Sequence, residues 1–147
     1  MHIVNGNITT ASILIAAGDD NVRQSLADTI DIIGISLAIS TARDALSTIQ
    51  AAKTELPDIL ILDQTLPPGS GPAVAAEIHR SSELKYTKII LLTGHEDSPE
   101  STALAANTSH TYIHKPFEMA DLEARVLDLL NGIQQSINRD NWARLLQ

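Results

Sequence analysis

Asp63 is a carboxylate that directly follows an uninterrupted apolar run, residues 59–62, and precedes a turn rich in proline and glycine. Such a run is typical of a strand that is buried on both faces, as in parallel sheets covered by helices. Ligands bind at the carboxyl edge of open α/β sheets, where these strands end. Asp63 is therefore either a carboxylate that acts on a ligand or a residue that only caps a turn.

Three other polar residues are expected at the same edge. Asp19, Thr93 and Lys115 each follow an apolar run that is predicted to be a strand. Because the carboxyl ends of parallel strands meet at one edge, these side chains and Asp63 would converge on one crevice. Thr93 and Lys115 beside Asp63 favour a working site over a simple turn.

The elements that would position these residues alternate along the chain. The predicted strands cover residues 12–17, 35–40, 57–63, 88–93 and 111–114, and the predicted helices cover residues 22–33, 45–53, 70–78, 98–106 and 122–133. This alternation indicates a parallel sheet with helices on both faces, because right-handed crossovers place them there. We expect a flavodoxin-like, doubly wound α/β fold with strand order 2-1-3-4-5.

Composition narrows the class of protein. A chain of 147 residues with 44% hydrophobic residues suits one domain with an aliphatic core. The absence of cysteine excludes disulfides and thiolate metal sites. A net charge of −8 argues against a nucleic-acid surface. No apolar run is long enough for a membrane span, and no export signal is visible, so we expect a cytoplasmic protein.

Several short motifs occur here in the order known from one family. Pro67 and Gly71 follow Asp63 by four and eight residues, Thr93 ends the fourth predicted strand, and residues 115–117 are Lys-Pro-Phe. Each motif is weak alone, but all of them on the expected elements form a specific signal. The chain resembles the receiver domain of two-component response regulators.

The resemblance implies a role for each matching residue. Asp63 would accept a phosphoryl group from a histidine kinase, a phosphotransfer protein or a small donor. Thr93 would donate its hydroxyl to a phosphoryl oxygen, and Lys115 would pair with Asp63 or its phosphoryl group. Tyr112 would act with Thr93 as the conformational switch. The bond between Lys115 and Pro116 would be cis, which is plausible only before proline.

The resemblance also implies Mg²⁺, held by Asp63, the backbone carbonyl of Thr65 and two adjacent acids after the first strand. Counting back from Arg23, which matches an arginine common in the family's first helix, places those acids at Ala17 and Gly18, which cannot bind a metal through their side chains. Mg²⁺ neutralises developing charge in phosphoryl transfer. We therefore expect Mg²⁺ binding to be weak or absent.

The acids that follow the first strand leave a second alignment open. Asp19 lies one position late, and a shifted alignment would make Asp19 and Asp20 the acidic pair, with a shorter connection to Arg23. Both are also suited to cap the next helix, because their carboxylates accept bonds from its free N–H groups. Asp19 is thus a doubtful metal ligand.

The histidines lack the spacing of a metal site, and we expect them on the surface: His2, His79, His95, His110 and His114.

Three functions remain open. The first is a receiver that signals by phosphorylation of Asp63. The second is an atypical receiver that binds a partner protein, without phosphate, through the face formed by the fourth helix, fifth strand and fifth helix. The third, and weakest, is a small flavodoxin-like enzyme or nucleotide binder, since no phosphate-binding glycine loop is present. We favour the second and do not expect an enzyme.

The division of the chain follows from the resemblance. It covers residues 12–131, which we expect to form the receiver domain. Residues 1–11 are expected to be a loose arm, and residues 132–147 a helical extension or linker. The last helix either ends at Gly132 or continues to Ile137. The extension from Ile133 to Ile137 and three apolar residues after it indicate either a linker helix or a homodimer contact: Trp142, Leu145 and Leu146.

Overall fold

The computed structural model describes residues 2–4, 7–33, 36–94 and 110–145. Its main sheet has six strands, and the five parallel ones run in the order β3-β2-β4-β7-β8. This is the predicted flavodoxin-like order 2-1-3-4-5, which is confirmed. The strands are β1 (His2–Val4), β2 (Asn7–Ala16), β3 (Ser36–Ala42), β4 (Ile59–Asp63), β7 (Lys88–Thr93) and β8 (His110–His114), and the small pair is β5 (Thr65–Leu66) with β6 (Gly69–Ser70).

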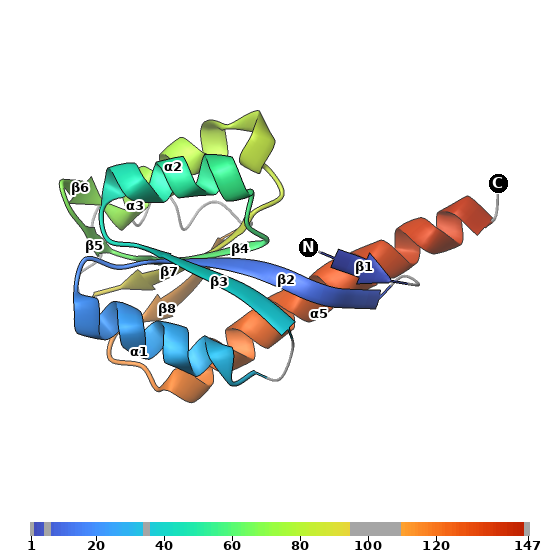
Figure 1. Cartoon of the computed structure of the whole chain (residues 1–147), viewed down its shortest axis with the longest axis horizontal. Helices are drawn as coiled ribbons and strands as arrows, with labels where there is room; N and C mark the ends of the chain where they lie inside the picture. Colours follow the sequence, from blue (N-terminus) through green and yellow to red (C-terminus); the bar gives the residue numbers. More distant parts are fainter. Residues whose placement is uncertain (1, 5–6, 34–35, 95–109, 146–147) are drawn as a thin grey trace.

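Helices cover both faces of the sheet. Figure 1 shows α1 and α5 on one face and α2 and α3 on the other. Alternate residues of β2, β4 and β7 therefore enter two separate aliphatic cores: Ile61 packs with α1 and α5, and Leu62 packs with α2 and α3. The helices are α1 (Asp20–Asp31), α2 (Ala45–Glu55), α3 (Gly71–Arg80) and α5 (Met119–Leu145), with a short 3-10 helix, η1 (Ser82–Leu84), after α3.

The beginning of the chain differs from the predicted loose arm. β1 pairs antiparallel with β2, with Ile3 opposite Ile8 and Val4 opposite Asn7. β2 consequently begins at Asn7 rather than at Ser12. The backbone N–H and C=O groups of these residues therefore bond within the sheet, whereas those of a free arm would bond to water.

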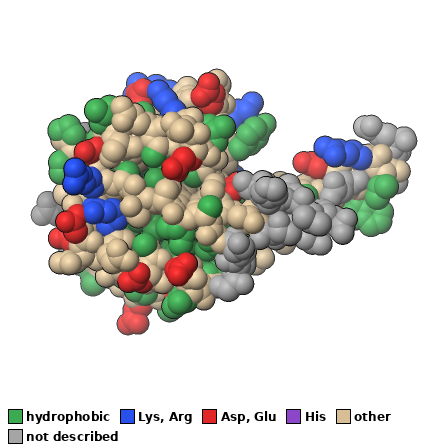
Figure 2. Space-filling view, viewed as in Figure 1, with side chains coloured by type: hydrophobic (Ala, Val, Ile, Leu, Met, Phe, Trp, Pro, Cys, Tyr) green, Lys and Arg blue, Asp and Glu red, His purple; other side chains and the backbone are tan. Residues whose placement is uncertain are grey.

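The last helix, α5, does not end at Gly132. α5 continues without interruption to Leu145. Glycine inside a helix costs about 1 kcal/mol relative to alanine, but the half-buried Ile133 and Ile137 extend the apolar face of α5 beyond it. Figures 1 and 2 show the end of α5 projecting from the rounded body of the domain. The predicted helix over residues 98–106 lies outside the described residues.

None of the helices in the described part of the chain combines the length and the apolar character needed to cross a bilayer.

Candidate functional site

Asp63 lies at the carboxyl end of the central strand β4, between the ends of β2 and β7. Only 5% of its surface is exposed. The chain then turns sharply, because the N–H of Gly71 donates to the carbonyl of Gln64 (2.8 Å). A Cβ atom on Gly71 would lie 2.1 Å from the carbonyl oxygen of Asp63, so only glycine allows this turn to close against the strand.

Lys115 neutralises the Asp63 carboxylate. Its Nζ donates to Oδ1 (2.9 Å) and to Oδ2 (3.0 Å) of Asp63. The N–H of Thr65 also donates to Oδ1 (3.1 Å). The Lys115–Pro116 peptide is cis, as predicted. Charge-assisted bonds to both oxygens hold a nearly buried carboxylate that would otherwise be costly to desolvate.

Thr93 ends β7 beside Asp63 and is 3% exposed. Its Oγ1 lies 2.7 Å from Nδ1 of His114 and 3.5 Å from the carbonyl oxygen of Ile113. The hydroxyl is therefore engaged by β8 rather than directed at the carboxylate. His114 is itself exposed, as expected of a surface histidine, but its ring is tied to the site.

Gln64, the residue after Asp63, connects the two loops at this edge. Its side-chain Oε1 accepts a hydrogen bond from the N–H of Gly94, directly after β7. Its own backbone N–H donates to the carbonyl of Leu92 (2.8 Å). Gln64 thus joins the turn after β4 to the end of β7 through both backbone and side chain.

Tyr112 lies on β8 and packs against the core that α2 and α3 cover. Its hydroxyl is buried and has no hydrogen-bond partner among the residues described. Burial raises the pKa of the Tyr112 phenol above its usual value, because the ionised form would lose hydration. The side chain therefore has an inward position, as the predicted switch residue would have in one of its two states.

No acidic side chain stands at the end of β2. Ala17 is fully buried in the core, and Gly18 follows it. Asp19 caps α1, since its Oδ1 accepts from the N–H of Val22 (3.0 Å). Asp20 pairs with Arg23, whose other nitrogen donates to the carbonyl of Ala17 (2.9 Å). Both acids therefore have partners within the α1 turn.

Comparison with known proteins decides the family. The sequence model of the response regulator receiver domain matches residues 13–127. The chain belongs to the response regulator receiver domain family. A relative in Cyanidium caldarium, named probable transcriptional regulator ycf27, is 31% identical over 122 residues, which are 83% of this chain and 47% of that protein. A second ycf27 protein, in Porphyridium aerugineum, is 27% identical over 88% of this chain and 52% of its own.

Solved receiver structures share the fold. The chemotaxis protein CheY4 of Vibrio cholerae superposes with a TM-score of 0.69 at 24% identity, over 82% of this chain and 98% of that one. A CheY-like receiver domain protein of Methanospirillum hungatei gives 0.73 at 23% identity, over 86% and 98%. The chain spans about half the length of the curated relatives that it matches first.

The receiver site offers few ligands for the Mg²⁺ that this family generally binds. Among the residues described, no group of three acidic, histidine or cysteine side chains could hold a metal ion. The oxygen atoms that could bind a metal at this edge belong to the Asp63 carboxylate, already paired with Lys115, and to the carbonyl of Thr65. A Cβ atom on Gly18 would lie 3.6 Å from that carbonyl, so an acid at this position would face the site, but glycine supplies none. This donor set does not fit a strong Mg²⁺ site.

Gln64 and His114 are residues of the site that the sequence did not single out. Each is adjacent in sequence to a predicted site residue, Asp63 and Lys115 respectively. Sequence adjacency was the only available signal, because alternation along a strand normally directs such neighbours to the opposite face. Here the strand ends allow both side chains to turn back to the edge.

Proposed function

We propose that this receiver domain signals chiefly through contact with a partner protein, and that Asp63 is an impaired phosphoacceptor. The observation that carries the proposal is the pairing of Asp63 with Lys115 at 2.9 and 3.0 Å, at an edge where Ala17 and Gly18 follow β2. A second or third carboxylate would repel Asp63 and compete for Lys115. Without them, the ion pair is little opposed and favours one conformation in the absence of phosphate.

The same arrangement weakens phosphoryl transfer. The reaction is accelerated mainly by positioning and by neutralising the charge that develops on the phosphoryl oxygens. Mg²⁺ supplies much of this when it is bound, and here Asp63 and the Thr65 carbonyl would hold it, with Asp19 contributing through water at most. Lys115 and Thr93 remain as the residues that would stabilise a phosphoryl group at Asp63.

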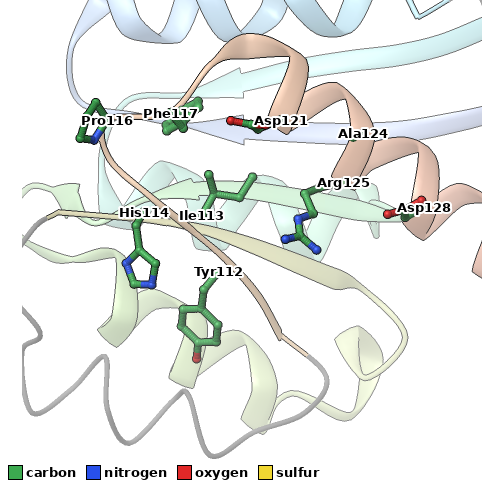
Figure 3. A pocket seen from close by; sticks show the side chains of 9 residues that line it. All are labelled: Tyr112, Ile113, His114, Pro116, Phe117, Asp121, Ala124, Arg125 and Asp128. Atoms are coloured by element: carbon green, nitrogen blue, oxygen red, sulfur yellow. The ribbon is translucent and has the colours of Figure 1, made fainter.

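The proposed contact surface is formed by β8 and α5. A pocket of about 410 Å³ opens between them, lined in part by Tyr112, His114 and Phe117. Figure 3 shows Arg125 on α5 between Asp121 and Asp128, beside the strand. A mixed row of charges next to an aromatic pocket suits a protein partner of complementary charge. The fourth helix of the predicted face lies outside the described residues.

The partner belongs to one of a few classes. Receiver domains interact with histidine kinases or phosphotransfer proteins. Relatives include hybrid signal transduction histidine kinase D of Dictyostelium discoideum and the phosphate regulon transcriptional regulatory protein PhoB of Rhizobium meliloti. A kinase, a phosphotransfer protein or another signalling protein is thus the proposed partner.

The homodimer stays a prediction. Trp142 and Leu145, on the projecting end of α5, are 65% and 77% exposed.

The test is incubation with Mg²⁺ and acetyl phosphate, followed by mass spectrometry of the intact chain, with Asp63→Asn as the control. We expect little or no phosphorylated species in the wild type. A stable, high-yield phosphorylated species that disappears in Asp63→Asn would overturn the proposal. It would establish the alternative function, a fully phosphorylatable receiver, which is favoured by the convergence of Asp63, Thr93 and Lys115.

A further inference from the structure

Four hydrogen-bonding groups lie at the edge of the sheet that carries Asp63, and each already has a partner within the chain. Lys115 and the Thr65 N–H donate to Asp63 itself. The Thr93 hydroxyl contacts His114, and the Gly94 N–H donates to Gln64. Groups of this kind at neighbouring strand ends would suit an oxyanion, because preorganised hydrogen-bond donors stabilise its charge. Here the chain's own atoms take that place.

The Gln64–Gly94 contact is the least expected of these. A backbone N–H group just beyond the end of a strand has no ladder partner in the sheet and must find another acceptor. The amide oxygen of Gln64 instead comes from the residue next to the carboxylate, and it also faces the Cα of Gly94, since a Cβ there would lie 3.2 Å from it. A neutral acceptor placed one residue from Asp63 satisfies the N–H without adding charge to the site.

We propose that Gln64 is an internal substitute for an oxyanion, acting with His114 to hold the end of β7 in one fixed conformation. The Gln64 oxygen accepts the hydrogen bond of the Gly94 N–H, and the His114 ring contacts the Thr93 hydroxyl. A phosphoryl or phosphate oxygen can use these donors only after it displaces both side chains. This inference rests on the proposed function, because it explains how a receiver keeps one conformation without phosphate.

The first measurement is amide hydrogen exchange at Gly94 by NMR, in the wild type and in Gln64→Ala. Loss of one hydrogen bond predicts exchange that is about fivefold faster in the variant. Gln24→Ala is the matched control, because Gln24 also uses its side-chain amide in a hydrogen bond, to Asp28 on the exposed face of α1. Exchange at Gly94 that differs by less than about twofold between wild type and Gln64→Ala would overturn the proposal.

The second measurement asks whether the freed donors take an anion. Asp63→Asn removes the charge that repels phosphate, and inorganic phosphate is titrated into this variant and into Asp63→Asn/Gln64→Ala. We expect the double variant to bind phosphate at least about fivefold more tightly. Equal affinities, or no binding by either variant, would overturn the proposal, even if exchange at Gly94 were faster. Neither result depends on phosphorylation or on a partner protein, so the proposed function is tested separately.

Discussion

The geometry of the site depends on Gly71 because this residue has no side chain. The turn after Asp63 packs so closely on β4 that the first atom of any side chain at Gly71 would overlap the backbone of Asp63. Backbone atoms cannot move aside as the end of a flexible side chain can. The close approach of this turn to Asp63 therefore requires glycine at this position.

We expect Gly71→Ala to lower the free energy of unfolding by at least about 2 kcal/mol, measured by urea denaturation. Gly132→Ala is the matched control. A Cβ atom at Gly132 meets nothing within 4 Å, and alanine is the better helix former, so this variant should gain about 1 kcal/mol. If the two substitutions changed stability by the same amount and sign, the close packing at Gly71 would be refuted.

At the scale of elements, the convergence of Asp63, Thr93 and Lys115 was predictable, because parallel strands end at one edge of the sheet. The length of α5 was not, because Gly132 is a normal stop signal, yet the helix continues past it with Ile133 and Ile137 half-buried. The pairing of β1 with β2 and the contacts of Gln64 and His114 depend on tertiary geometry. The periodic pattern of apolar residues does not indicate which hydrogen-bond partner a polar side chain at the end of a strand will contact.

The N-terminal cap of α2 leads to a prediction of how the stability of the fold depends on pH. The Ser47 N–H donates to the Asp44 carboxylate (2.7 Å), and the Ser47 hydroxyl contacts the Asp44 N–H in return. The first of these bonds does most to lower the pKa of Asp44 below its usual value. A pKa that is lower in the folded state stabilises the fold above the unfolded pKa of about 3.9. That contribution is lost as the pH falls through the folded value.

The measurement compares the free energy of unfolding of the wild type and Asp44→Asn from neutral to acid pH. The wild type should have its full advantage near pH 7 and lose it below about pH 3.9. Asp28→Asn removes the same charge within α1 and controls for the general effect of net charge. A difference between wild type and Asp44→Asn that is constant over the whole range would count against the cap.

At the scale of the whole molecule, the domain has the receiver fold, and the edge of the sheet that carries Asp63 has no acid at Ala17 or Gly18. The two cores and the strand order place the ends of β2, β4, β7 and β8 as the family requires. At the end of β2, Gly18 faces the Thr65 carbonyl without an acid. A single acid at Gly18 should therefore strengthen the binding of Mg²⁺ at this edge. The nearest obstacle is the Pro67 ring, 3.1 Å from the added Cβ.

The most direct test of the single-carboxylate site is a Mg²⁺ titration of the wild type, Gly18→Asp and Gly18→Asn, followed by the amide NMR signals of residues 63–65. The wild type and Gly18→Asn should bind Mg²⁺ at least about tenfold more weakly than Gly18→Asp, because only the last adds a charged oxygen ligand. Mg²⁺ binding by the wild type that is as tight as that of Gly18→Asp would contradict the account.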